Sequence, residues 1–444
     1  FLGEEPPVLP SRELTLAGAI GVSRQWEQQR LRLLYALAQG RVPVLVASLD
    51  ALLLRTLPRQ TLFSASVTLR VGAEYSMPEL IERLTRAGYS RASLVEGVGQ
   101  FALRGGILDV YSPAQEKPLR AEFFGDELDT MGYFDPITQR RTENVDEAVL
   151  LPVAETEPHL HPQGISGLCE DLRAIIARQQ RRKTPNQALI ETLQKDCEAL
   201  ENETLFASAD RYMALIYPEF TTAASYLPQE AIVAFCDHGN LQRGEKDRAE
   251  EFGLLLDSFL TSGTLFGELC DYYATMDDLA ASLRGRAVIY CDSFLAARYP
   301  ESLPPKQLLS FTARQLPGYG GSLETAAADL KNYASNQYGS IVLCGGQRRG
   351  EILKELLAKS GLNALLSFPL TKLPQPGQIL IAGGSLPAGL EYPTLKFAIL
   401  TEGQIAVRQE RKKTRAPKKA TNRKKLDSFT DLTPGDLVVH EHHG

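Results

Sequence analysis

The sequence lacks several features that would point directly to a function. No apolar run reaches the roughly 18 residues of a membrane-spanning helix, so we expect no contact with a membrane. No G-x-x-x-x-G-K-[ST] motif occurs, so no lysine is placed to reach nucleotide phosphates. The six cysteines are scattered without C-x-x-C spacing. That pattern favours reduced thiols in a cytoplasmic protein over a disulfide scaffold.

Histidine is also scarce, with six residues in the chain. Three of them, His440, His442 and His443, lie in a strand-like run whose side chains point to alternating faces, with no cysteine nearby. Zinc is therefore not favoured there, and no Ser-His-Asp or Cys-His arrangement can be argued. We expect no catalytic residue, cofactor or metal ion in this segment.

Length and charge describe a chain of several parts. Its 444 residues are too many to fold around a single hydrophobic core, so the length predicts roughly two to four domains. The net charge of −6 hides an asymmetry: Arg408–Lys425 holds ten basic residues and one acid, which leaves 38 basic and 53 acidic residues elsewhere. The main part is therefore no nucleic-acid surface. The basic run has no apolar face and contains Pro417, so we expect an extended linker, and contact with DNA stays open.

Two glycine-rich stretches resemble ligand loops. Gly97–Ala102 mimics a dinucleotide fingerprint, but a strand-like run follows it, so its amides lack a helix dipole. Gly318–Ser322 does precede a predicted helix, but no basic residue accompanies it. An entry loop is the favoured interpretation of the second stretch.

A run of short apolar stretches separated by Gly, Pro and Asp predicts an antiparallel meander. Its expected strands are Val98–Leu103, Ile107–Tyr111, Leu119–Phe124 and Leu128–Phe134. Between the last two, Gly125-Asp126 is a two-residue hairpin turn with glycine first.

Strand period divides the third run into two faces. One set is an ordinary core face: Leu119, Ala121 and Phe123. The other set leaves a large aromatic between charged neighbours on the expected solvent side: Arg120, Glu122 and Phe124. Phenylalanine with arginine is a combination typical of interface anchors. Arg104 precedes Gly105-Gly106, where a bulge or close backbone approach is expected, so parity does not assign its face.

This stretch resembles the UvrB-homology module of the bacterial transcription-repair coupling factors. The matching patterns are F-x-x-R-G-x-I-x-D-x-Y at Phe101–Tyr111, R-x-x-F-F-x-D-E-[LI]-[DE] at Arg120–Asp129 and F-D-x-x-[ST]-Q-R at Phe134–Arg140. At the other end, Asp431–Gly444 resembles the opening of that family's RNA-polymerase-interaction domain, G-D-x-V-V-H-x-x-H-G.

The resemblance implies a function for the intact protein. Such a protein recognises stalled RNA polymerase, displaces it along double-stranded DNA with ATP and magnesium, and recruits the excision-repair protein UvrA. It implies UvrA-binding residues here: Arg104, Arg120 and Phe124. The bland alternative is that either arginine only pairs with Glu122 or Asp109 on the sheet surface. The ATPase motor would lie outside this segment, which is expected to be inactive by itself.

Other elements alternate between helix and strand. Helices are predicted at Ser23–Gln39, Asp50–Leu57, Pro78–Ala87, Ile165–Gln180, Asn186–Asn202 and Leu241–Leu260. Strands are predicted at Val42–Ala47, Glu230–Cys236 and Arg286–Cys291, the first and last of them buried. From Gly318 to about Leu400 the pattern predicts a separate α/β domain with a parallel sheet. Its elements are Ser322–Ser335, Ser340–Leu343, Arg349–Lys359, Ala364–Phe368, Gln378–Ala382 and Lys396–Leu400.

Together these features predict an α/β multidomain chain. With the resemblance, the expected parts are a UvrB-like α/β domain in two segments, 1–65 (its start lying before Phe1) and 151–305, an inserted UvrA-binding β module, 66–150, a small α/β domain, 306–404, a basic linker, 405–428, and the start of a small Tudor-like β domain, 429–444.

Two alternatives remain beside this assignment. UvrB also has F-F-G-D-E, but its longer R-N-D and R-V-R-G-D runs are absent here, and the G-D-L-V-V-H tail is foreign to it. A dinucleotide-binding α/β enzyme is the third interpretation, and it depends on the weak glycine pattern alone.

Overall fold

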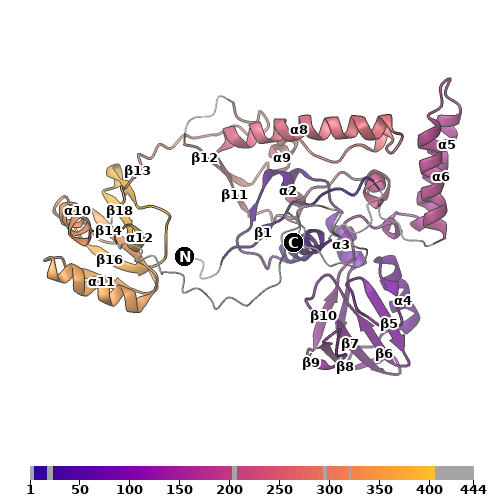
Figure 1. The fold of residues 1–444 in the computed structure, drawn as a ribbon, viewed down its shortest axis with the longest axis horizontal. Helices are drawn as coiled ribbons and strands as arrows, with labels where there is room; N and C mark the ends of the chain where they lie inside the picture. The colour runs from indigo at the N-terminus through magenta and orange to yellow at the C-terminus, as the bar shows by residue number, and fades with distance from the viewer. Residues whose placement is uncertain (1–4, 18–23, 203–207, 294–297, 320–321, 406–444) are drawn as a thin grey trace, which may run out of the picture. The chain divides into compact units, whose positions relative to one another are not determined.

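The computed structural model describes residues 5–17, 24–202, 208–293, 298–319 and 322–405 (Figure 1). The described residues divide into two units, one that ends at Gln307 and one that begins at Leu308. Parallel and antiparallel sheets both occur, together with helices, which confirms a mixed α/β chain. The basic run, the three C-terminal histidines and Ser23 lie outside the described residues.

The first unit contains a six-stranded sheet in the order β4-β5-β6-β7-β8-β9. Its strands are β4 (Ser90–Arg91), β5 (Gln100–Arg104), β6 (Ile107–Val110), β7 (Leu119–Phe124), β8 (Glu127–Phe134) and β9 (Arg141–Asn144). From β5 to β9 every neighbouring pair is antiparallel, so the predicted meander is confirmed. Gly125 has φ of 65°, as a turn with glycine first requires.

A second layer completes this module. Strand β3 (Val67–Arg70) pairs antiparallel with β10 (Glu147–Leu150), and helix α4 (Met77–Arg86) begins one turn after β3. Leu80 and Leu84, one helical turn apart on α4, are buried in the same cluster as Leu119 and Ala121 of β7. One face of the sheet therefore packs on α4 and β3.

The rest of the first unit is largely helical. Its helices are α1 (Gln25–Ala38), α2 (Leu49–Leu53), α3 (Arg59–Ala65), α5 (Gly164–Gln180), α6 (Gln187–Glu201), α7 (Met213–Ile216), α8 (His238–Thr261) and α9 (Met276–Ser282). The largest buried cluster joins Leu31 and Leu34 of α1 to Leu168 and Leu172 of α5, with partners as far as Leu269. Segments before and after the β module thus share one core.

Charged side chains are buried inside that shared core. Arg12 makes two hydrogen bonds of 2.9 Å to the carboxylate of Asp210, and Arg30 Nε donates to Glu155 at 2.6 Å. Thr56 donates to the other Glu155 oxygen at 2.7 Å. Paired in this way, the charges avoid the cost of isolated burial. The contact between Arg12 and Asp210 connects residues 198 positions apart, and those of Glu155 with Arg30 and Thr56 span 125 and 99 positions.

Two expected buried strands differ in the structure. Val42–Ala47 contributes only β2 (Val46–Ala47), which pairs in parallel with β1 (Val8–Leu9), and Val46 is exposed. Strand β12 (Ala287–Cys291) pairs in parallel with β11 (Ile232–Cys236), but alternate side chains on both strands are exposed. The prediction of burial was wrong because an apolar run does not say whether a second layer covers the other face.

The second unit holds one six-stranded sheet in the order β13-β17-β18-β14-β16-β15. Its elements are β13 (Arg314–Gln315), α10 (Leu323–Ser335), β14 (Gly339–Cys344), α11 (Gln347–Lys359), β15 (Ala364–Ser367), β16 (Ile379–Gly383), β17 (Leu390–Tyr392), β18 (Phe397–Thr401) and α12 (Glu402–Ile405). The four long strands are parallel as predicted. The antiparallel edge of β13 and β17 was missed because both strands are only two or three residues long.

Candidate protein-interaction surface

The solvent side of β7 carries the residues singled out in the sequence. Leu119 and Ala121 are fully buried, whereas the Phe124 side chain is 85% exposed. The strand alternation inferred from the sequence is therefore confirmed at these positions. Phe124 lies opposite Glu127 across the β7–β8 hairpin. An exposed phenyl ring at a hairpin end presents apolar area that a partner can bury.

Arg120 and Arg104 both meet Asp109 on β6. Arg120 Nε and Nη2 donate to the two Asp109 oxygens at 2.7 and 2.8 Å, and Arg104 Nη2 approaches Oδ2 at 3.5 Å. The hydrogen bond to Asp109 raises the pKa of Arg120, with burial opposing it. Asp109 is itself buried, and both guanidinium groups lie on its solvent side. This contact places Arg104 on the face of Arg120, which parity had left open.

The alternative that the arginines form ion pairs on the sheet is therefore partly correct, since both pair with Asp109. This pairing still leaves part of each arginine side chain exposed to solvent. The Arg104 side chain is 55% exposed, and the Arg120 side chain is 21% exposed. The bidentate carboxylate orients the planar guanidinium of Arg120. Arg104 makes one contact with Asp109, at 3.5 Å, and keeps further N–H donors for carboxylates or carbonyls of a partner. Glu122 pairs instead with Arg141, at 3.4 Å.

Sequence reasoning missed what lies under Arg120. Its guanidinium carbon is 4.7 Å from the ring centre of Phe134, which is fully buried. Phe134 belongs to a small apolar cluster with Val95 and Ala102 on this second face of the sheet. Asp109, one of the two partners considered from the sequence, is the register partner of Arg120 on β6. We call Arg104, Asp109, Arg120 and Phe124 the Arg–Phe patch.

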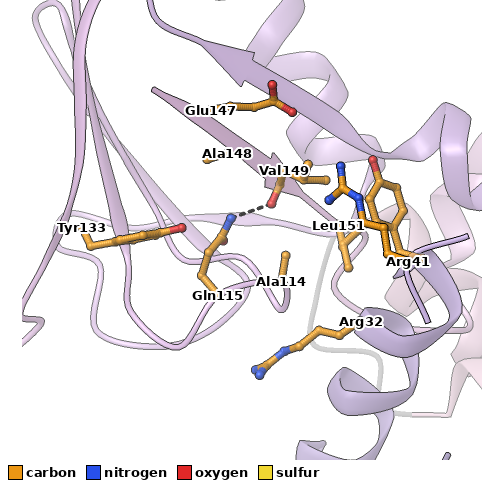
Figure 2. Close-up of a pocket in the computed structure, with 10 residues that line it drawn as sticks. Arg32, Arg41, Ala114, Gln115, Tyr133, Glu147, Ala148, Val149 and Leu151 are labelled. Carbon is orange, nitrogen blue, oxygen red and sulfur yellow. Dashed lines mark hydrogen bonds between the residues drawn. The ribbon is translucent and has the colours of Figure 1, made fainter. Parts of the chain in front are cut away.

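A pocket of about 300 Å³ lies beside the module, between α1 and β10 (Figure 2). Arg32 and Arg41 face it together with Glu147, so its walls carry both signs of charge. Gln115 donates to the carbonyl of Val149 at 2.6 Å across it. This bond ties the 112–118 loop to β10. The pocket is better explained as part of the junction of α1 with the β module than as a ligand site.

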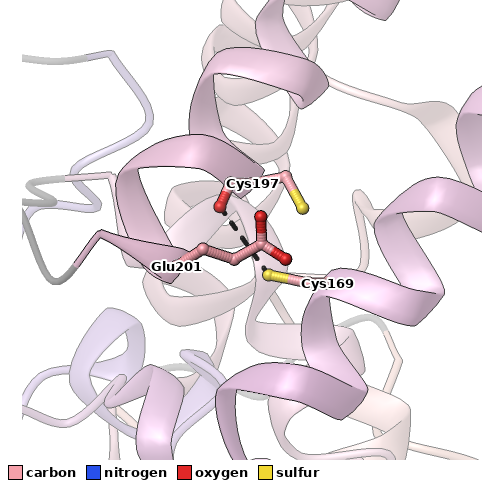
Figure 3. Close-up of side chains that lie close together, drawn as sticks. All are labelled: Cys169, Cys197 and Glu201. Carbon is pink, nitrogen blue, oxygen red and sulfur yellow. Dashed lines mark hydrogen bonds between the residues drawn. The ribbon is translucent and has the colours of Figure 1, made fainter.

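Two thiols and a carboxylate meet on the α5–α6 hairpin (Figure 3). The ligand atoms of Cys169, Cys197 and Glu201 lie within 4.8 Å of one another. Burial raises the pKa of the Cys169 thiol to about 12, so its thiolate is disfavoured near neutral pH. Glu201 is also paired with Arg173. We therefore assign the group to helix packing.

The glycine pattern at Gly97–Ala102 leads into strand β5 and not into a helix, which agrees with its rejection as a nucleotide loop. Gly318–Ser322 precedes α10, but residues 320 and 321 lie outside the described residues. Within the described part of the chain, no helix is both long and apolar enough to span a membrane.

Comparison with known proteins gives these features a context. Residues 67–155, which contain the whole six-stranded sheet, match the family model of the UvrB interaction domain. A transcription-repair-coupling factor of Staphylococcus aureus (strain USA300) is 27% identical over 429 residues, 95% of this chain and 35% of the relative. The chain is similar to the transcription-repair-coupling factors. The coupling factor of Bacillus subtilis (strain 168) is 25% identical over 441 residues, 98% of this chain and 36% of its own length.

The chain thus spans about a third of the length of the curated coupling factors it matches. The family resemblance inferred from short motifs is confirmed along nearly the whole chain. The Arg–Phe patch lies inside the part that matches the UvrB interaction domain.

Proposed function

We propose that this chain supplies the UvrA-binding part of a transcription-repair coupling factor, with Arg104, Arg120 and Phe124 as the contact residues. One observation carries the proposal: β7 presents an 85% exposed phenylalanine at its hairpin end, and Arg120 of the same strand pairs, together with Arg104, with one buried aspartate. Apolar anchors next to oriented arginines are the usual energetic centre of protein interfaces. The match of residues 67–155 to the UvrB interaction domain supports the choice of partner.

We propose the following organisation for the chain. Residues 1–65 and 151–305 make one UvrB-like domain, and the UvrA-binding module of residues 66–150 is inserted between them. The core shared by α1 and α5 supports this arrangement. Residues 306–404 form the small α/β domain, 405–428 the linker and 429–444 the start of a Tudor-like RNA-polymerase-interaction domain.

For the intact protein we propose ATP-dependent displacement of stalled RNA polymerase from DNA in the cytoplasm, with magnesium as the companion of ATP. The names of the relatives support the link to transcription and repair. The motor would belong to the two thirds of the relatives' length that this chain does not cover. The contribution of this segment would be recruitment, not catalysis.

Replacing Phe124 by alanine tests the proposal. Truncating an interface anchor costs about 2 kcal/mol, so Phe124→Ala should weaken UvrA binding roughly thirtyfold. The melting temperature should not change, because this side chain is exposed. Calorimetric titration with UvrA and a thermal melt give both readouts.

Phe311→Ala is the matched control, since Phe311 is also exposed but lies in the second unit. It should bind UvrA like the parent chain. Unchanged affinity of Phe124→Ala, or a loss equal to that of the control, would contradict the proposed site.

A further inference from the structure

We propose that Ile137, at the tip of the β8–β9 turn, is a second apolar anchor of the same docking surface. The inference rests on the proposed function, because the occupant is the partner that the Arg–Phe patch binds. Ile137 is 90% exposed, the most exposed large apolar side chain among the described residues. A single exposed aliphatic residue means little by itself. What distinguishes Ile137 is the turn that holds it.

Hydrogen bonds within the turn fix its backbone conformation. The Asp135 carboxylate accepts from the backbone N–H groups of Ile137 and Thr138 at 3.0 and 2.7 Å. Gln139, with φ of 58°, donates its N–H to the Asp135 carbonyl at 2.8 Å and its side-chain amide to Pro136 at 2.7 Å. An apolar side chain on such a turn loses little backbone entropy when a partner covers it.

The same turn is attached to the Arg–Phe patch. Arg120 Nη1 donates to the Gln139 carbonyl at 3.3 Å, and Nη2 reaches Gln139 Oε1 at 3.4 Å. Arg120 is therefore held on one side by Asp109 and on the other by the turn that presents Ile137. The surface around Ile137 is continuous with the proposed interface and not a separate feature.

Strand direction places the two apolar residues at opposite ends of this surface. Phe124 lies at the β7–β8 hairpin, and the turn with Ile137 follows β8 at its other end. β8 has eight residues, so these ends are roughly 25 Å apart at about 3.3 Å per residue. A standard interface covers about 800 Å² per partner, a patch roughly 30 Å across. A partner seated on Phe124 and Arg120 thus has the reach to cover Ile137.

The positions of Phe124, Ile137 and the two arginines predict which groups the binding surface of UvrA should carry. Two apolar pockets should flank a central group of carboxylate or carbonyl acceptors facing Arg104 and Arg120. Apolar anchors surrounding a paired charge exclude water from it, which strengthens its hydrogen bonds.

Ile137→Ser and Ile137→Leu in the full chain test this inference by titration with UvrA and by thermal melts. Ile137→Ser should weaken binding about tenfold or more without lowering the melting temperature, and Ile137→Leu should retain binding within about twofold. Ile352→Ser is the control, because Ile352 is exposed on α11 in the second unit, and it should bind like the parent chain.

Phe124→Ala is measured in parallel to separate the two claims. If Phe124→Ala weakens binding but Ile137→Ser does not, the second anchor is wrong and the proposed function stands. If Ile137→Ser lowers affinity and melting temperature together, its role is structural and the inference is also overturned. If Phe124→Ala has no effect, the proposed surface itself fails and the inference fails with it.

Discussion

At the scale of single residues, Asp109 organises the candidate surface. Its side chain is 2% exposed, yet it faces two arginines that reach toward solvent. A buried carboxylate needs cationic partners to offset its loss of solvation. The pairing already restricts the rotamers of the two arginines, so less side-chain entropy is lost when UvrA binds. Asp109 is buried and does not itself contact UvrA in the proposed interface. It is a positioning residue that sets the direction of Arg120.

Asp109→Asn should therefore weaken UvrA binding by about fivefold or more while keeping the side-chain shape. The amide removes the charge and one of the two acceptors that hold Arg120. A double-mutant cycle with Arg120→Ala is the decisive measurement, because residues that act through one another are not additive. Additive losses of binding free energy would show that Asp109 acts separately from Arg120.

At the scale of elements, the β6–β7 pairing depends on a glycine. Gly106 accepts from the N–H of Phe123 at 2.7 Å, and a Cβ on Gly106 would lie 2.6 Å from the Phe123 carbonyl oxygen. The strand must therefore approach closely here, as the Gly105-Gly106 pair predicted. This approach lies at the end of the hairpin that presents Phe124.

Gly106→Ala should destabilise the module by about 1–3 kcal/mol, because backbone on both sides must move to relieve the contact. Gly253→Ala is a control of opposite sign. Gly253 lies inside α8 with open space around it, and alanine there should stabilise the helix by about 0.5–1 kcal/mol. Urea unfolding curves of both variants provide the comparison. Equal stability of Gly106→Ala and the parent chain would contradict the close approach.

The sequence predicted helix bounds well where the apolar periodicity extends over many residues. Helices α5 and α6 begin and end within a residue or two of the expected bounds. Burial was predicted less well, since β11 and β12 were recognised as strands but leave alternate side chains exposed. Periodicity reports local backbone geometry, whereas burial depends on which other layer is present.

At the scale of the whole molecule, buried ion pairs join distant segments of the first unit. Burial raises the pKa of Asp210, but the charge of Arg12 and hydrogen bonds from Arg12, Thr156 and Thr15 outweigh it and hold that pKa below its usual value. The pair therefore contributes stability at pH values above about 4, the range in which an unfolded aspartate is ionised. That contribution is lost as the pH falls through the lower pKa of the folded state.

Arg12→Ala should cost about 3–5 kcal/mol of unfolding free energy at pH 7, because it leaves Asp210 buried without its cation. The difference from the parent chain should shrink in acid, as Asp210 becomes protonated. Arg178→Ala removes an exposed pair with Glu268 and should cost at most about 1 kcal/mol. Chemical unfolding at pH 7 and at pH 3 measures both. A pH-independent difference for Arg12→Ala would contradict the ionic explanation.

The sequence by itself determined the meander, its Gly125-Asp126 turn, the exposed side of Phe124 and the family resemblance. Each of these is encoded in neighbouring residues, by strand alternation, turn chemistry or a short motif. Only the tertiary structure decided that Asp109 holds Arg120 and Arg104, that Phe134 lies beneath Arg120, and that Arg12 meets Asp210. Such pairs depend on strand register and on the path of the chain between residues far apart, and no local pattern specifies either.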